Sequence, residues 1–334
     1  MKLRVGFLGF AHGHQFGLVS QIDPQYAKIG AIADEEPCRL NGALERLSGR
    51  LSNVKVYEDY YDLIRDENID LVSICVENDK KTELIIESAE AGKHIVVEKP
   101  MSLKLEDLEE IYNKVRDSGV NLSMYLSERF NSLYVTLKDY IRSGGIGKPV
   151  LFYAFRPHKL IPEQRPKWMF NKKRYGNIIL DLAIHDIDYL LWVNKSKVTE
   201  IKAYMNNQRF TNLDFTDNCL ISMKFSNGAK AVVTATWLTP EAAPYHGKVK
   251  LDAIGTLGEA YLMRNEKTIE VCTVSEPPHT LRIVETEKFL HNVVRSIIEG
   301  RKPLVDLEAS VEANRICLLA SLSAESGRSL RFED

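Results

Sequence analysis

Glu98, Lys99 and Pro100 follow a short apolar run, His94–Val97, and are the residues whose types and position best indicate chemistry. Carboxylate and ammonium groups are costly to desolvate, and proline cannot continue a β-ladder, so these residues should end a buried strand. In open α/β sheets, ligands bind beyond the carboxyl ends of the strands. Lys99 is therefore predicted to face a ligand-binding cleft, close to the reactive end of a cofactor.

A second group of titratable residues lies on a predicted helix from about Asn177 to Trp192. Asp181 and His185 are four residues apart and Asp188 follows three later, which puts all three on one helix face. A carboxylate that pairs with an imidazole raises its pKa and fixes its tautomer, as a general base near neutral pH requires. The alternative is structural, because acids are favoured near helix N-termini and single histidines often only support the fold.

A dinucleotide-binding turn is indicated by the hexapeptide Gly9-Phe10-Ala11-His12-Gly13-His14. Only its first glycine matches the pattern G-x-G-x-x-G, so the turn alone is a weak signal. The stronger signal is Asp34, about 20 residues further on, where an acid that accepts both ribose hydroxyls is expected. Asp34 could instead cap the helix that follows it.

Asp34, Glu35 and Glu36 form a run of three carboxylates with no arginine expected at the site, and they would repel a 2′-phosphate. NAD is therefore favoured over NADP. Further cofactor contacts are expected after the strand Leu71–Val76 and around the lysine: Val76, Glu77, Asn78, Glu98 and Lys99. His12 and His14 could suggest a metal, but without a nearby third ligand no metal is expected.

The composition excludes several classes of protein. The 334 residues carry 44 Lys+Arg against 46 Asp+Glu, which gives no case for binding nucleic acid or an anionic membrane. No 18-residue apolar stretch indicates a membrane span. Five scattered cysteines without a CxxC pair indicate neither a disulfide framework nor a zinc site, so a cytoplasmic location is expected.

The first third of the chain alternates strand and helix patterns, which predicts a parallel sheet with right-handed crossovers. Strands are predicted at Leu3–Leu8, Lys28–Ala33, Leu71–Val76, His94–Val97 and Val120–Tyr125. Helices are predicted at Phe16–Ile22, Glu36–Leu47, Tyr60–Arg65, Lys81–Ala91 and Leu105–Asp117. The pattern changes near residue 125, so a Rossmann domain over 1–125 and a substrate-binding and oligomerisation domain over 126–334 are expected.

The second domain is predicted to combine helices with a mostly antiparallel sheet, because alternating runs follow one another through tight turns such as Ser226-Asn227-Gly228. Strands are predicted at Val198–Met205, Asn218–Phe225, Ala229–Trp237, Val249–Ile254, Glu259–Met263 and Thr268–Val274. Helices are predicted at Leu133–Arg142, Asn177–Trp192, Thr286–Glu299 and Leu307–Glu325. The sheet's outer face is expected to join subunits into a homodimer or homotetramer, through Ile221, Met223, Phe225, Val233 and Trp237.

An irregular segment, residues 157–175, is expected to face the cleft and to bind substrate. Arg156 and His158, just before and within it, are candidate ligands. Trp168 could stack on a sugar ring or serve as a plain hydrophobic anchor. Tyr245 and His246 are weaker candidates.

These motifs together resemble a known family. Glu98-Lys99-Pro100, Asn78, Arg129-Phe130, Gly144–Gly147 and Asp181-x-x-x-His185, in this order, are similar to the glucose–fructose oxidoreductase / inositol dehydrogenase / MocA-type (Gfo/Idh/MocA) family. The resemblance covers nearly the whole chain. It implies a Rossmann domain, an open-faced antiparallel sheet that makes dimers or tetramers, and Lys99 as catalytic lysine with Asp181 and His185 as partners. Lys99 would also contact substrate, as would Asp181 and His185.

The implied reaction is hydride transfer between NAD and a secondary alcohol or carbonyl of a sugar, polyol or related small molecule. The chain departs from the family pattern at Glu77 and Lys81, where Pro and His are usual, and at Tyr175-Gly176-Asn177, where three glycines are usual. Two alternatives stay open: an NAD-retaining, redox-assisted glycosidase, and a non-catalytic NAD-binding sensor.

Overall fold

The computed structural model describes residues 2–51 and 54–332, and the chain divides into two compact units. The first unit takes the chain up to Leu126 together with Glu287–Asn314, and the second takes Ser127–Thr286 together with the chain from Arg315 on. The change of unit at 126–127 lies beside the predicted boundary. Residues 287–314, expected in the second domain, cluster instead with the first unit.

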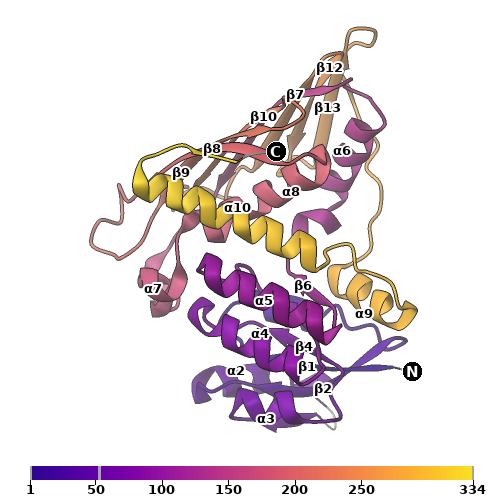
Figure 1. Cartoon of the computed structure of the whole chain (residues 1–334), viewed down its shortest axis with the longest axis vertical. Helices are drawn as coiled ribbons and strands as arrows, with labels where there is room; N and C mark the ends of the chain where they lie inside the picture. Colours follow the sequence, from indigo (N-terminus) through magenta and orange to yellow (C-terminus); the bar gives the residue numbers. More distant parts are fainter. Residues whose placement is uncertain (1, 52–53, 333–334) are drawn as a thin grey trace. The chain divides into compact units, whose positions relative to one another are not determined.

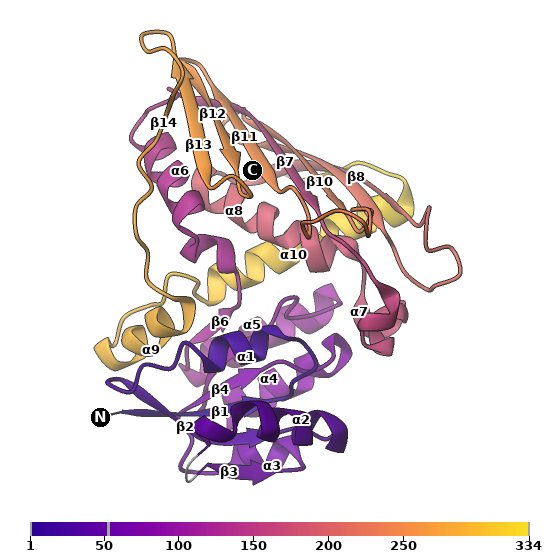
Figure 2. The same cartoon turned by 180° about the vertical axis from the view of Figure 1, so that it is seen from behind.

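The first unit is a parallel sheet in the order β3-β2-β1-β4-β5-β6, covered by helices on both faces (Figures 1 and 2). Its strands are β1 Leu3–Leu8, β2 Ala27–Ala33, β3 Lys55–Tyr57, β4 Leu71–Ile74, β5 His94–Val97 and β6 Leu122–Met124. Its helices are α1 His14–Val19, α2 Pro37–Leu47, α3 Tyr60–Arg65, α4 Lys81–Glu90, α5 Leu105–Ser118 and α9 Phe289–Glu299. The fold is therefore the predicted Rossmann type, and its strand order reverses between β1 and β4.

The apolar sequence of the central strands explains their position, because a strand covered on both faces reads as a continuous apolar run. All four residues of β4 are buried, as are Ile95, Val96 and Val97 of β5. β3 was not predicted, because it is three residues long, polar and exposed at the sheet edge.

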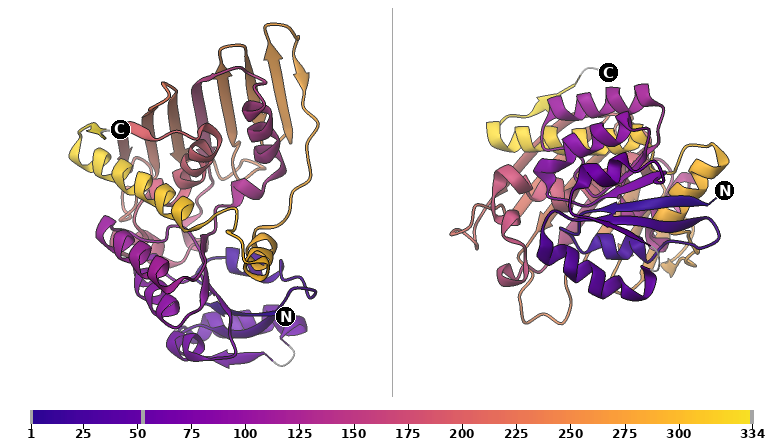
Figure 3. Two further views of the ribbon diagram at one scale, coloured as in Figure 1. Left: turned by 45° about the vertical axis from the view of Figure 1, so that its right-hand side comes forward. Right: turned by 90° about the horizontal axis from the view of Figure 1, so that it is seen from below.

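The second unit is built on a nine-stranded sheet in the order β14-β13-β12-β11-β7-β10-β9-β8-β15, in which only β7 and β10 pair in parallel. The strands are β7 Pro149–Pro157, β8 Val198–Asn206, β9 Asn218–Phe225, β10 Lys230–Thr236, β11 Lys250–Gly255, β12 Gly258–Met263, β13 Thr268–Thr273, β14 His279–Thr280 and β15 Leu330–Arg331. The helices are α6 Ser132–Arg142, α7 Lys172–Tyr175 and α8 Ile184–Asn194, with α10 running from Leu307 to Ser326. Helices α6 and α8 lie on one face of the sheet (Figure 3).

Two features of this unit differ from the prediction. β7, a central strand, was missed because its residues, Pro149 to Pro157, mix aromatic and aliphatic side chains without alternation and begin and end with proline. The predicted helix from Asn177 begins instead with a π-helical turn, Ile179–Ala183, which leads into α8. Such turns are rare and often mark functional sites.

The sheet residues proposed as a subunit contact lie on the wrong face. Ile221, Met223, Phe225, Val233 and Trp237 are at most 3% exposed, because their strand positions point toward the helices. Successive residues of a strand alternate between faces, and the opposite face carries Tyr153, Tyr204 and Leu220, exposed by 41%, 59% and 42%. The uncovered apolar surface exists, but these neighbouring residues form it.

Among the helices of the described residues, none combines the length and the apolar character needed to cross a membrane.

Candidate functional site

The turn after β1 has the backbone that a dinucleotide-binding loop needs. Gly9 adopts φ +77°, and a Cβ there would lie 2.6 Å from Val76 Cγ1 and 2.9 Å from the Cys75 carbonyl oxygen. Its N–H donates to Ala33 at the end of β2, and the N–H of Ala11 donates to Cys75 after β4. The turn is therefore fastened between two strand ends, and only glycine fits its first position.

Asp34 follows β2 as predicted, but it is fully buried and its oxygens are already occupied. Oδ2 accepts the N–H of Phe10 at 2.8 Å, and Oδ1 accepts the N–H of Glu36 at 2.9 Å. The Nε of Arg39 donates to both oxygens at 3.0 Å. Asp34 thus ties the turn to the residue before α2, but it does not cap this helix, whose N-cap is Glu36.

Arg39 is the residue of this site that sequence reasoning missed. Besides Asp34, it contacts Glu77 after β4, with Nη1 2.8 Å from Oε1. Burial lowers the pKa of Arg39, but hydrogen bonds to the two carboxylates more than offset this, and the pKa is raised. The expectation that no arginine stands beside Asp34 is wrong, because Arg39 lies in the first turn of α2. Its five-residue spacing from Asp34 was the available signal.

The Lys99 segment is held by a buried ammonium group. Lys81, at the start of α4, is fully buried and donates from Nζ to Asn78 Oδ1 at 2.8 Å. It also donates to the carbonyl oxygens of Glu98, Lys99 and Pro100 at 2.7, 3.2 and 3.1 Å. Lys81 therefore fixes the backbone of the whole motif, whose Lys99–Pro100 peptide is cis.

Beyond β5 the side chains of the motif form a charged row. Lys99 is 5% exposed, and its Nζ lies 3.8 Å from Glu98 Oε1. Glu98 is 3% exposed and accepts from His14 Nδ1 at 3.0 Å. Burial raises the pKa of Glu98, but His14, His12 and Lys99 outweigh it and lower the pKa to about 2. Glu98 is thus an anion that draws Lys99 toward the strand end.

Glu98 also supplies the third ligand-type group that the sequence did not reveal. Nitrogen or oxygen atoms of His12, His14 and Glu98 lie within 4.8 Å of one another. The statement that the histidine pair has no such neighbour is therefore wrong. His12 Nδ1, however, accepts the N–H of His14, and the Lys99 ammonium competes for Glu98. The expectation that no metal binds stays a prediction.

A second fastening follows the motif. Asn314 of α10 accepts the N–H groups of Met101 and Ser102 through Oδ1, at 2.7 and 3.1 Å. Its Nδ2 donates to the carbonyl of Ser102 at 3.0 Å. All three residues are buried, so residue 314 completes the backbone hydrogen bonding just after Lys99-Pro100.

Asp181 and His185, the candidate catalytic pair of the second unit, are both 8% exposed. Asp181 stands in the π-helical turn and accepts from the hydroxyl of Tyr175 at 2.6 Å. Tyr175 is buried, and burial followed by the Asp181 charge raises its pKa well above the ordinary value. The phenol is a permanent donor that orients Asp181.

Two predicted site residues are structural instead. Arg156 is 2% exposed, with Nε and Nη2 on Asp186 at 2.7 and 2.8 Å and Nη1 2.9 Å from Glu128. Two buried carboxylates occupy its guanidinium, so it is no substrate ligand. Asp188 is likewise buried against Arg129, at 2.7 Å, and does not join Asp181 and His185.

The segment after β7 forms an aromatic cluster around Tyr175. Its ring is 6.2 Å from that of Trp168 and stacks on Phe215 at 5.4 Å. Phe215 continues to Trp237 at 6.3 Å, and Trp237 contacts His158 edge-on at 5.5 Å. Trp168 is 9% exposed and packs in this cluster, and its stacking on a sugar ring stays a prediction.

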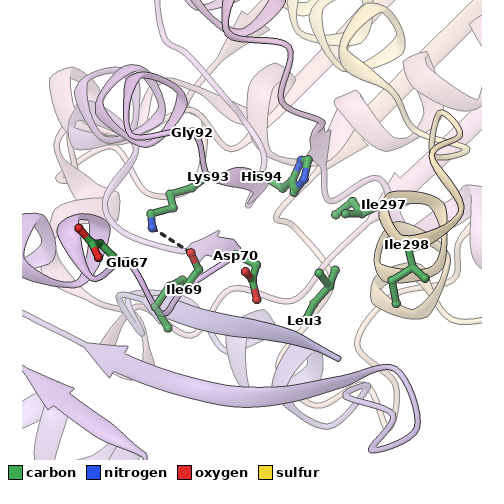
Figure 4. Close-up of a pocket in the computed structure, with 9 residues that line it drawn as sticks. All are labelled: Leu3, Glu67, Ile69, Asp70, Gly92, Lys93, His94, Ile297 and Ile298. Carbon is green, nitrogen blue, oxygen red and sulfur yellow. Dashed lines mark hydrogen bonds between the residues drawn. The ribbon is translucent and has the colours of Figure 1, made fainter. Parts of the chain in front are cut away.

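A pocket of the first unit lies at the amino ends of its strands (Figure 4). It measures about 530 Å³ and is lined by Leu3, Asp70, Lys93 and His94, among others. Lys93 donates to the carbonyls of Asp66 and Ile69. Lys93 and Asp70 of this pocket are thus engaged within the fold. Ligands of such sheets bind at the opposite edge, beyond the carboxyl ends of the strands.

Comparison with known proteins agrees with this architecture. Residues 3–126 match the oxidoreductase family with an NAD-binding Rossmann fold, and residues 134–261 match the GFO/IDH/MocA C-terminal domain. The scyllo-inositol 2-dehydrogenase (NAD(+)) of Bacillus subtilis is 30% identical over 263 residues, which cover 78% of this chain and 72% of the relative. The myo-inositol 2-dehydrogenase of Thermotoga maritima is 25% identical and covers 99% of this chain and 97% of its own.

Solved structures share the fold at lower identity. An oxidoreductase from Thermotoga maritima superimposes with a TM-score of 0.90 at 24% identity, over 99% of this chain and 100% of its own. The aldose-aldose oxidoreductase of Caulobacter crescentus, solved with glycerol, gives 0.86 at 17% identity, over 99% and 100%. The protein is therefore an oxidoreductase with an NAD-binding Rossmann domain. It belongs to the Gfo/Idh/MocA family, as the motifs had indicated.

Proposed function

We propose that this protein is an NAD-dependent dehydrogenase that oxidises a secondary alcohol of a sugar, polyol or related small molecule, or reduces the matching carbonyl. Its family and its inositol dehydrogenase relatives support this reaction class. The observation that carries the proposal is Lys99, an almost buried ammonium at the end of β5, whose backbone is fixed by Lys81. Burial of the Lys81 and Lys99 ammonium groups costs folding free energy, which indicates that Lys99 has a role other than stability.

The residues of the first unit fit the cofactor. The turn from Gly9 to Gly13 offers a close backbone approach to a pyrophosphate, because a side chain at its first position would clash. Val76, Glu77 and Asn78 follow β4 on the same edge. Asp34 can accept ribose hydroxyls once Arg39 turns away, so cofactor binding is expected to displace Arg39.

The charges around Arg39 favour NAD over NADP. Arg39 is shared between Asp34 and Glu77, so the three groups together carry one negative charge. A 2′-phosphate would have to break two ion pairs to reach the guanidinium and would then face both carboxylates. NAD displaces Arg39 from Asp34 alone and brings no phosphate against the two carboxylates.

Bound NAD supplies the hydride acceptor, and the side chains manage the proton and the charge. His185 takes the proton of the substrate hydroxyl, while the hydride leaves the carbon that bears this hydroxyl. Asp181, oriented by Tyr175, holds the imidazole in the tautomer that accepts this proton. Lys99 donates a hydrogen bond to the reacting oxygen and stabilises its developing negative charge.

The test compares the native chain with Lys99→Ala on a panel of polyols and aldoses with NAD and NADP. NADH formation by the native chain, lost by at least about 100-fold in Lys99→Ala, is expected. Sugar release from a glycoside without net NADH would favour the redox-assisted glycosidase. Cofactor binding without oxidation, unchanged by Lys99→Ala, would favour the sensor, and absence of cofactor binding would refute all three.

The open sheet face supports a proposal about assembly. Tyr153, Tyr204 and Leu220 expose apolar area that the helices leave uncovered, so we expect a homodimer or homotetramer through this face. Tyr153→Glu should shift the sedimentation coefficient toward the monomer. A native chain that sediments as a monomer at micromolar concentration contradicts the assembly. The five cysteines are unpaired, which fits the expected reducing compartment.

A further inference from the structure

The segment that follows β7 carries an unusual charge. Between residues 157 and 175, six basic residues stand against one acid, Glu163. The basic residues are Lys159, Arg165, Lys167, Lys172, Lys173 and Arg174. The whole chain is close to neutral, so this excess of positive charge is local and belongs to the part of the second unit that surrounds Asp181.

Arg165 differs from the other enclosed arginines of this unit. Arg129 and Arg156 are each neutralised by buried carboxylates. Arg165 is half-buried, and its Cζ lies 5.1 Å from the centroid of the Trp237 ring. Among the residues that the structure describes, no carboxylate lies within 4 Å of it. A guanidinium over the face of an indole can still donate from its N–H groups to a planar anion.

The same aromatic cluster joins Arg165 to the candidate catalytic residues. Trp237 leads to Phe215 and then to Tyr175, whose hydroxyl donates to Asp181 at 2.6 Å. Burial and the Asp181 charge raise the pKa of the Tyr175 hydroxyl, and the charge of Arg165 lowers it. Arg165 and Asp181 therefore border one cluster of side chains within a single unit.

The other polar groups of the cluster carry no negative charge, and the neutral His158 donates from Nδ1 to the Pro157 carbonyl, which leaves its Nε2 as an acceptor. The indole Nε1 of Trp168 is buried and has no hydrogen-bond acceptor among the described residues. His158 is kept neutral, because burial and the nearby Arg156 lower its pKa to about 3. Lys159 projects toward the carbonyls of Glu241 and Ala243. A neutral polyol would use none of this positive potential.

We propose that the substrate is a sugar acid and that Arg165 binds its carboxylate while Asp181 and His185 address a hydroxyl. This inference rests on the proposed dehydrogenase function and narrows its substrate class. A carboxylate matches one guanidinium in charge and geometry. A phosphate dianion fits less well, since Asp181 stands on the same cluster and a second unpaired cation would be needed.

The experiment uses matched pairs of an acid and its neutral counterpart with NAD: D-glucuronate and D-glucose, D-galacturonate and D-galactose, D-gluconate and D-glucitol. Arg165→Met is compared with Lys173→Met, which removes the same charge from an exposed position of the same segment. The native chain should prefer the acid of a pair. Arg165→Met should lower kcat/KM for that acid about 100-fold, leave the neutral partner within about threefold, and raise KM more than it lowers kcat. Lys173→Met should change neither.

The outcomes separate this inference from the proposed function. Oxidation of neutral members at least as fast as the acids, or of sugar phosphates in preference to both, overturns the sugar-acid inference and leaves the dehydrogenase in place. Calorimetric binding of an acid to the native chain but not to Arg165→Met, without any oxidation, supports the carboxylate site at Arg165 and refutes the dehydrogenase. If the native chain neither binds nor oxidises any of the acids, the inference is overturned.

Discussion

Replacing Lys81 with methionine tests how the Lys99 segment is positioned. The substitution keeps the length and most of the volume of the side chain, but it removes an ammonium that serves four acceptors. Three of these are backbone carbonyls of residues 98–100, and Lys81 itself is fully buried. Unsatisfied buried acceptors cost about 1–3 kcal/mol each, and loss of one buried charged partner costs about 3–5 kcal/mol in all. We expect the free energy of unfolding to fall by about 4 kcal/mol.

Activity should fall further than stability alone explains. The Lys99 ammonium must lie within hydrogen-bond reach of the reacting oxygen, and a shift of about 1 Å can reduce the rate about 100-fold. We therefore expect kcat of Lys81→Met to drop about 100-fold at a temperature where urea titration shows the chain folded. Lys81→His, whose imidazole can still donate one hydrogen bond, should restore part of this loss.

Lys93→Met is the matched control. Lys93 is also a buried lysine of the first unit that donates to backbone carbonyls, of Asp66 and Ile69, but it lies at the amino end of β5 (Figure 4). Lys93→Met should lower the free energy of unfolding and leave kcat unchanged. Equal effects of the two substitutions on kcat, or full activity of folded Lys81→Met, would refute the positioning role.

Three further predictions concern other contacts. Folding keeps His158 neutral with a pKa of about 3 against 6.5 when unfolded, so the free energy of unfolding should fall as the pH drops below 6.5, by about 2 kcal/mol at pH 5. In urea titrations His158→Asn should lack this part, and an unchanged pH slope contradicts the assignment. Tyr175→Phe should lower kcat/KM about tenfold and shift its pH profile, because Asp181 loses its donor, with a stability change of under about 1.5 kcal/mol. Glu77→Gln should raise the NADP-to-NAD ratio of kcat/KM about tenfold by freeing Arg39 from one carboxylate; an unaltered ratio counts against that ion pair as a determinant.

The sequence was sufficient for the fold because both domains follow simple periodic rules. Alternating apolar strands and capped helices indicated the parallel sheet, and the hairpin at Ser226-Asn227-Gly228 is present, with Gly228 at φ +88°. β7 could not be predicted in the same way. It lies in the middle of its sheet, where neighbours on both sides and helices on one face decide its conformation more than its own pattern does.

For the site, sequence reasoning found residue types but not their partners. Asp34, Lys99 and Asp181 stand at strand or helix ends, which local pattern reveals. Arg39 and Tyr175 act through contacts that depend on how loops meet, and no periodicity encodes those. Arg156 shows the opposite error, since an arginine before an irregular loop looks available until two buried carboxylates are found against it.

Asn314 has a consequence for how the molecule is made. A ribosome releases the strands of the Rossmann sheet early, but the amide that secures Ser102 lies 212 residues further along the chain and emerges much later. A nascent or prematurely terminated polypeptide thus carries the lysine motif on a segment still lacking its final tether.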